Sequence, residues 1–159
     1  MEPAKLNGLE LIRAMSRGEL PPATMAETIP MRIARVEKGD VEFKVTANKG
    51  HLNPMGGVHG GFAATALDSV TGCAVHTTLG PGESYGTVDL NVKMLRPVPV
   101  NRELSAKGRV ISVSRRIGVS EGVLTDGEGR IYAHATATCM IFRKDAASIA
   151  ENGGTRAAA

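Results

Sequence analysis

The residues whose spacing suggests chemistry lie between Asn53 and Asp68. Residues 53–61 form a glycine-rich stretch, Asn-Pro-Met-Gly-Gly-Val-His-Gly-Gly. The segment 62–79 that follows is rich in alanine, leucine and valine, and Asp68 is its only acidic residue. This composition predicts a helix that is buried on nearly all sides. An isolated carboxylate in such a helix is costly, which favours a catalytic role over a merely structural one.

Glycines at the start of the predicted helix leave backbone N–H groups free at the positive end of the helix dipole. Such groups can stabilise the oxyanion that forms when a carbonyl is attacked, and we predict that Gly60 is the donor. A glycine here could also serve only the tight turn into the helix, and both reasons can hold.

The distance between the two groups limits how they can cooperate. Asp68 follows Gly60 by eight residues, which on a helix is about 12 Å of rise. A general base must lie within about 3 Å of the proton that it removes. If both groups act on one substrate atom, Asp68 must therefore come from a second copy of the chain. Two antiparallel helices related by a two-fold axis would form two such sites, which predicts an obligate homodimer.

The pattern Asn-Pro-x-Gly-x-x-His-Gly-Gly, with an acid nine residues after the histidine, resembles the hotdog-fold acyl-CoA thioesterases of the phenylacetate-degradation (PaaI-like) group. Residues 87–97 resemble the next strand of that family, and the similarity extends over roughly residues 8–143. The resemblance implies a thioester hydrolase in which Asp68 is the general base on a water or the nucleophile on the thioester carbonyl. The sequence leaves both roles open.

The resemblance also implies roles for other positions. Asn53 would orient the water or the thioester carbonyl, although a turn residue before proline is an alternative. Thr87 would help to hold the water, although threonine is common in strands. His59 could act as a base, or support the loop where the helix starts. Arg115 and Arg116 match a region in which the family places basic residues against the phosphates of coenzyme A, although a solvated turn also explains them.

The elements that would position these residues follow the order of an α+β domain. Apolar residues at helical spacing predict a helix over 7–17. Period-two alternation predicts strands over 31–37, 41–47, 87–95, 104–113, 117–125 and 130–142. In the third strand, Thr87 alternates with an apolar set, Val88, Leu90, Val92 and Met94. The resemblance implies the hotdog fold, an antiparallel sheet wrapped around one long central helix.

Three segments are expected along the chain. Residues 1–28 form an N-terminal helix and loop, residues 29–143 the hotdog thioesterase domain, and residues 144–159 a tail rich in alanine and glycine that we expect to be disordered. The first residues lack a signal-peptide pattern, and no uninterrupted apolar run is long enough to span a membrane. These features predict a cytoplasmic protein without a membrane partner. The family commonly forms dimers of dimers, so a homodimer or homotetramer is expected.

Composition narrows the function further. Aromatic residues make up 3% of the chain and tryptophan is absent, which leaves few platforms for stacking nucleic-acid bases and argues against a nucleic-acid partner. The net charge of +3 suits a polyanionic ligand such as coenzyme A. The chain has no Gly-x-Ser-x-Gly motif, no phosphate-binding loop and no cluster with metal-ligand spacing. We expect no metal and no cofactor, because coenzyme A is part of the substrate.

Two other functions compete with the thioesterase. A hotdog enoyl-thioester hydratase or dehydratase would pair a catalytic histidine with the helix acid. This chain has His51 and His59, but not the loop of those relatives. A non-catalytic acyl-CoA-binding module would bind the thioester without cleaving it, which leaves Asp68 and Gly60 unexplained. The acyl group is also open, since an aryl acid or a medium-chain aliphatic acid fits the sequence.

Overall fold

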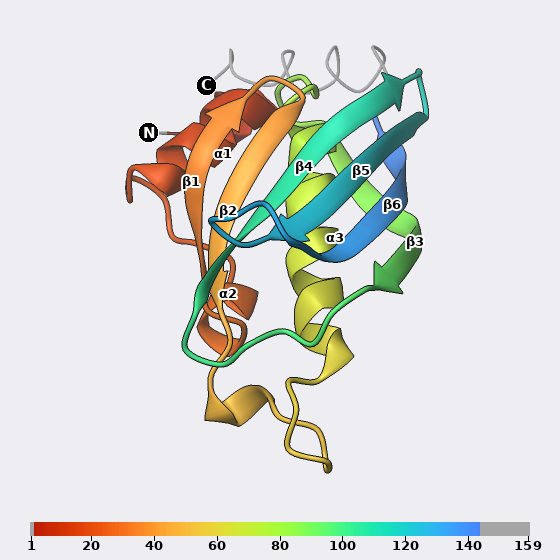
Figure 1. Ribbon diagram of the computed structural model, residues 1–159. Helices are drawn as coiled ribbons and strands as arrows, with labels where there is room; N and C mark the ends of the chain where they lie inside the picture. The colour runs from red at the N-terminus through yellow and green to blue at the C-terminus, as the bar shows by residue number, and fades with distance from the viewer. Residues whose placement is uncertain (1, 144–159) are drawn as a thin grey trace, which may run out of the picture.

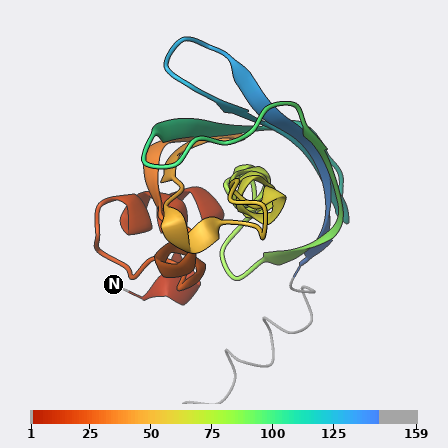
Figure 2. The ribbon, with the colours of Figure 1, turned by 60° about the horizontal axis from the view of Figure 1, so that its bottom comes forward.

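The computed structural model describes residues 2–143. Within this range six strands form one antiparallel sheet in the order β1-β2-β4-β5-β6-β3. The sheet curves around the long helix α3 (Gly60–His76), as Figures 1 and 2 show. This is the predicted α+β architecture. The strands are β1 (Met31–Glu37), β2 (Asp40–Thr46), β3 (Ser84–Met94), β4 (Glu103–Val113), β5 (Ile117–Thr125) and β6 (Ile131–Phe142).

Helix α3 is buried on most sides, as its composition predicts. Ala66, Leu67 and Val70 are completely buried in the core. Two glycines paired across β4 and β5, Gly108 and Gly122, allow the helix to approach the sheet closely. A Cβ atom on Gly108 would lie 2.5 Å from the carbonyl oxygen of Val70, so a larger residue would push the two layers apart. No helix within residues 2–143 is long and apolar enough to cross a membrane.

The N-terminal segment packs beside β1, next to the open part of the curved sheet (Figure 2). Helix α1 (Gly8–Ser16) begins with a capping box, in which Asn7 Oδ1 accepts a hydrogen bond from the Glu10 N–H at 2.9 Å. Its Ile12 side chain is 1% exposed and joins the main core. The predicted division of the chain at residues 28 and 29 stays a prediction, and the predicted disordered tail lies outside the described residues.

Three short helical turns were not predicted from the sequence. The 3₁₀ turns η1 (Pro3–Lys5) and η2 (Lys49–His51) and the helix α2 (Met25–Thr28) each span only three or four residues. Such segments are too short to show a periodic pattern of apolar residues. Helix α2 matters for the site, because it places Met25 beside a cavity that α3 also lines.

Strand β3 departs from simple alternation. Its register with β6 shifts between Thr87 and Asp89, which makes Val88 the extra residue of a β-bulge. Thr87 therefore pairs with the buried Cys139 and lies on the helix side of the sheet, as does Leu90. The prediction that Thr87 and the apolar set occupy opposite faces is wrong for this reason, and the Val88 side chain is 58% exposed.

Candidate active site

Asp68 lies in the middle of α3 and lines a cavity of about 710 Å³, which we call the Asp68 cavity. Thr87 and Tyr85 from β3 line the same cavity. The Oδ1 atom of Asp68 is buried and has no hydrogen-bond partner among the described residues. A buried carboxylate oxygen without a donor costs roughly 1–3 kcal/mol or more. Such a group in a native structure points to a function that needs it.

Asp68 is the anionic group at its end of the cavity. Burial, followed by the negative charge of Asp68, raises the pKa of the Cys73 thiol to about 12. The pKa of the Tyr85 hydroxyl is raised by burial and by the nearby cysteine and aspartate side chains. Both groups therefore remain protonated near neutral pH, and Cys73 is a poor nucleophile. Asp68 is the side chain there that can accept a proton or attack a carbonyl.

A second cavity, of about 530 Å³, lies at the N-terminal end of α3, and we call it the Gly60 cavity. Asn53, His59 and Gly60 line it together with Met94. The Gly60 N–H makes no hydrogen bond among residues 2–143, as expected in the first turn of a helix. A Cβ atom on Gly60 would lie 3.4 Å from the Cε atom of Met94. The exposed glycine thus presents a backbone donor to this cavity.

His59 is the N-cap residue of α3. Its Nδ1 atom accepts a hydrogen bond from the Gly61 N–H at 2.8 Å. A ring nitrogen that accepts this bond carries no proton, so a neutral His59 ring has its proton on Nε2. The sequence left two roles open for His59, a base and a support for the loop where the helix starts. This hydrogen bond is the one expected for the supporting role.

Asn53 organises the turn that precedes α3. Its Oδ1 atom accepts hydrogen bonds from the N–H groups of Met55 at 3.0 Å and Gly57 at 3.2 Å. Its backbone N–H donates to the Gly57 carbonyl at 2.8 Å. Because the oxygen serves the turn, the Nδ2 amide, which has no partner in the described part of the chain, is the group left to donate to a ligand.

In the part of the chain that the structure describes, the two cavities share no lining residue. The structure brings Asn53, His59 and Gly60 together at one end of α3, and it brings Thr87 to Asp68 at the middle. Within one chain the Gly60 N–H and the Asp68 carboxylate remain about 12 Å apart along the helix axis. Two copies of the chain are needed for one substrate atom to meet both.

The predicted phosphate-binding residues lie apart from both cavities. Arg115 and Arg116 are exposed in the turn between β4 and β5. Their backbone carbonyls accept hydrogen bonds from Arg143 Nε at 2.8 Å and from the Ile141 N–H at 2.7 Å. Arg96, in contrast, lines the Gly60 cavity, and its Nη1 atom donates to the Ile131 carbonyl at 2.6 Å.

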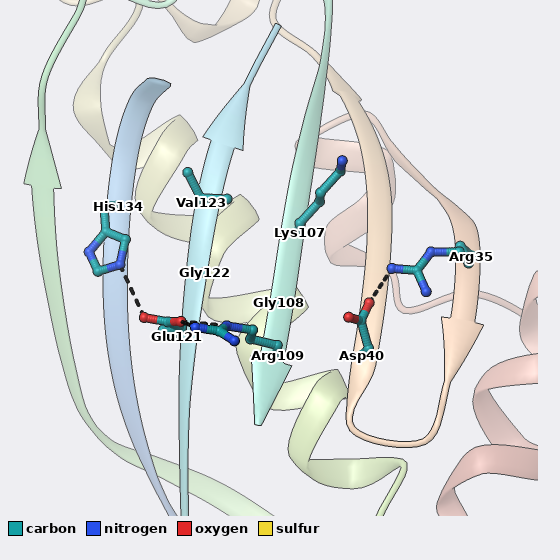
Figure 3. Close-up of a pocket in the computed structure, with 9 residues that line it drawn as sticks. All are labelled: Arg35, Asp40, Lys107, Gly108, Arg109, Glu121, Gly122, Val123 and His134. Carbon is teal, nitrogen blue, oxygen red and sulfur yellow. Dashed lines mark hydrogen bonds and ion pairs between the residues drawn. The ribbon is translucent and has the colours of Figure 1, made fainter. Parts of the chain in front are cut away.

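A third cavity, of about 250 Å³, lies across the sheet from α3 (Figure 3). Ion pairs cross it: Arg35 contacts Asp40, Arg109 contacts Glu121, and His134 Nε2 lies 3.5 Å from Glu121. The hydrogen bond from Arg109 lowers the pKa of Glu121. No predicted site residue lies here, and exposed ion pairs of this kind are common on protein surfaces.

His51, the other histidine that a hydratase would need, is engaged through both ring nitrogens. Nδ1 accepts a hydrogen bond from the Asn48 N–H at 2.9 Å. Nε2 lies 2.8 Å from the carbonyl oxygen of Thr28. His51 therefore holds the loop before α3 against the N-terminal segment and lines neither of the two α3 cavities. This arrangement disfavours the hydratase alternative.

No residue of the N-terminal segment was predicted from the sequence to be part of the site. Met15 from α1, Met25 from α2 and Met31 from β1 all line the Asp68 cavity. The available signal was the apolar Met25 within a stretch otherwise typical of a loop. Which cavity it lines depends on how α2 packs, and local sequence carries no information about that.

Comparisons with known proteins identify the family and the fold. Residues 55–133 match the family model of the thioesterase superfamily. A crystal structure of a phenylacetic acid degradation-related protein from Ralstonia eutropha JMP134 is 36% identical, with a TM-score of 0.75. The match covers 81% of this chain and 98% of that chain. The observed fold is therefore the predicted hotdog fold.

Two curated relatives extend the comparison. A protein of Halobacterium salinarum whose name describes it as an esterase is 37% identical over 98 residues, 57% of this chain and 64% of its own length. Acyl-coenzyme A thioesterase 13 from Mus musculus is 28% identical over 102 residues, 63% of this chain and 69% of its own length. The chain therefore belongs to the thioesterase superfamily, and the predicted class of enzyme, a thioester hydrolase, is confirmed at the level of this family.

Proposed function

We propose that the protein hydrolyses acyl-CoA thioesters to a free acid and coenzyme A. The observation that carries the proposal is the buried Oδ1 atom of Asp68, which lacks a partner and lines a large cavity. Membership of the superfamily supports the thioester as the reacting group. The name of the mouse relative, an acyl-coenzyme A thioesterase, supports coenzyme A as the carrier. The reaction uses no cofactor, because coenzyme A arrives as part of the substrate.

In the proposed mechanism the thioester carbonyl oxygen accepts a hydrogen bond from the Gly60 N–H, and the Asn53 Nδ2 amide donates to the carbonyl or to the water. Asp68 removes a proton from the water while its oxygen attacks the carbonyl carbon. The Gly60 N–H stabilises the oxyanion that forms. When the C–S bond breaks, coenzyme A leaves as a thiolate and takes up a proton. Thr87 would hold the water beside Asp68.

A second route uses the same groups. Asp68 attacks the carbonyl carbon directly, the thiolate leaves, and water then hydrolyses the mixed anhydride. Hydrolysis in ¹⁸O-labelled water under single-turnover conditions can demonstrate the second route. Label appears in the Asp68 carboxylate only if the anhydride forms and water attacks its aspartyl carbonyl.

We propose that each site is shared by two chains of a homodimer, which could assemble further into a dimer of dimers. The separation of the two cavities along α3 supports this. Strand β3 offers a surface for the contact, because it is an edge of the sheet and exposes Val88 by 58% and Met94 by 51%. An exposed apolar edge strand favours association with another chain.

Three arginines are candidates for the phosphates of coenzyme A. Arg115 and Arg116 stay candidates from the family resemblance, and Arg96 joins them because it lines the Gly60 cavity. Replacing a phosphate-binding arginine with glutamine should raise the KM for acyl-CoA severalfold and leave the KM for the matching acyl-pantetheine unchanged. An arginine whose replacement changes both KM values equally does not bind phosphate.

The test of the function is thiol release from a panel of aliphatic and aryl acyl-CoA esters, measured with a thiol reagent. We expect turnover that saturates with at least one ester. Tight binding of acyl-CoA without release of thiol would instead indicate a binding module. Loss of the enoyl absorbance of crotonyl-CoA without release of thiol would indicate a hydratase.

A further inference from the structure

The N-terminal segment forms one wall of the Asp68 cavity. Met15 on α1, Met25 on α2 and Met31 at the start of β1 converge on this space from three elements. The chain has seven methionines, and three of those within residues 2–143 line this one cavity. Met15 and Met31 are partly buried against the core, whereas Met25 is 50% exposed. Met15 and Met31 are therefore held by packing against the core, whereas the Met25 side chain has room to move into solvent.

The lining of the cavity divides into a polar group and a larger apolar part. Asp68, Ser69 and Thr87 supply the polar groups of α3 and β3, and Ser16 and Arg32 are the polar residues on the N-terminal side. The Arg32 guanidinium is paired with Glu103 at 3.1 Å. We call Met15, Met25 and Met31 the methionine wall. Further apolar residues continue it, namely Ile33, Phe43, Pro22, Ala23 and Ala26. A thioester whose carbonyl meets Asp68 would extend its acyl group along this apolar lining. Burial of methylene groups there is favourable.

The size and the chemistry of the lining favour an aliphatic acyl group over a single aromatic ring. A cavity of about 150 Å³ is enough to bind benzene, whereas the Asp68 cavity measures about 710 Å³. Among residues 2–143, two aromatic side chains line it, Phe43 and Tyr85. Methionine has three rotatable bonds and a polarisable sulfur, so methionine side chains adapt to chains of different length and shape.

We propose that the Asp68 cavity takes the acyl group as a flexible aliphatic chain, and that Met15, Met25 and Met31 set the chain length that is accepted. This inference rests on the proposed thioesterase function and names the substrate class of the same site. The three methionines are specificity-determining residues and take no part in the chemical step.

The first experiment measures kcat/KM for straight-chain esters from butyryl-CoA to palmitoyl-CoA, with phenylacetyl-CoA for comparison. Each buried methylene should raise kcat/KM on the order of threefold to fourfold, until the chain reaches the methionine wall and the values level off. Octanoyl-CoA should exceed phenylacetyl-CoA at least tenfold. A preference for phenylacetyl-CoA, or values that do not change with chain length, would overturn the proposal.

The second experiment changes the wall. Met15→Trp and Met31→Trp should lower kcat/KM for dodecanoyl-CoA at least tenfold and leave butyryl-CoA within threefold of the wild type, because only the long chain reaches the filled space. Met140→Trp is the matched control, since Met140 is exposed on β6 and lines none of the three cavities. This control should leave the whole chain-length profile unchanged.

A third variant covers the case in which a tryptophan prevents folding. Met25→Ala removes the half-exposed side chain of the wall. The chain length at which kcat/KM levels off should then increase. An unchanged profile in Met25→Ala, or tryptophan variants that lower butyryl-CoA and dodecanoyl-CoA equally, would contradict the assignment. Thiol release with a flat profile rejects this inference alone, whereas absence of thiol release from every ester rejects the proposed function as well.

Discussion

The two cavities on α3 differ in what the helix contributes to each. At the Gly60 cavity the helix offers a backbone donor, and two side-chain atoms beside it accept backbone hydrogen bonds: His59 Nδ1 caps the helix and Asn53 Oδ1 holds the turn. At the Asp68 cavity the helix offers a side-chain acceptor whose Oδ1 atom has no partner in residues 2–143. Among residues 2–143, the Gly60 cavity is lined by the free N–H at the start of α3 but by no carboxylate, whereas the Asp68 cavity is lined by a carboxylate but not by the start of α3.

In the proposed mechanism, this difference leaves neither cavity with all the groups of the reaction within one chain. Both groups belong to one rigid helix, so no side-chain movement can close the distance of about 12 Å between them. In the proposed homodimer, a two-fold axis between antiparallel helices would form two complete sites, because each chain would lend its Gly60 N–H to the other. Variants at the Gly60 cavity and at the Asp68 cavity should therefore differ in how much activity and how much stability they lose.

The largest expected effect is that of Asp68→Asn. We expect kcat to fall on the order of 10²–10⁴, the usual contribution of a general base, when thiol release is measured. The free energy of unfolding in urea should not fall, since asparagine has nearly the same volume and removes a buried charge. Glu128→Gln, at an exposed acid of the β5–β6 turn, is the control. Activity within tenfold of the wild type would remove Asp68 from the mechanism.

A smaller loss is expected from Gly60→Pro, which replaces the N–H group by the proline ring. Gly60 is the first residue of α3, a position where proline is well tolerated. The preceding His59 has φ −62° and ψ 136°, which suits a residue before proline. Thiol release should be slower by a factor on the order of 10²–10³.

Gly60→Ala is the matched control for this variant, because it keeps the N–H and adds only a Cβ atom near the flexible end of Met94. We expect it to stay within tenfold of the wild type. Equal losses of activity in the proline and alanine variants would show that glycine is needed because it has no side chain, and not because its N–H donates a hydrogen bond.

The smallest effect on activity is expected at His59. Asparagine is also a strong N-cap residue, so His59→Asn should keep kcat within about tenfold of the wild type, whereas His59→Ala should lower the free energy of unfolding by about 1 kcal/mol. Thermal unfolding and thiol release are measured on the same samples. A hundredfold loss of kcat in both variants, without a change in stability, would make His59 a base.

Much of this architecture could be predicted from local patterns. The composition of residues 62–79 is enough to indicate a buried helix, and alternation locates the strands to within about three residues. Alternation fails at Val88, because a bulge shifts the register and no local pattern marks it. The bulge matters for the site, since it turns Thr87 towards Asp68.

Other parts of the site depend on contacts between distant segments. The methionine wall joins residues 15, 25 and 31 to Asp68 only after the N-terminal segment has packed beside β1. Spacing along the helix, in contrast, was enough to predict that Gly60 and Asp68 cannot meet within one chain. Distances along a rigid helix can be predicted from the sequence. The positions of residues in loops such as 17–24, or in the turn with Arg115, cannot.

The most direct test of the shared site is complementation between two inactive variants. Asp68→Asn and Gly60→Pro chains are unfolded together, refolded as a mixture, and assayed for thiol release beside each variant treated alone. A mixed dimer has one site with both groups intact, so random pairing should restore about one quarter of the wild-type activity. Activity of the mixture no higher than that of the separate variants would contradict a site built from two chains.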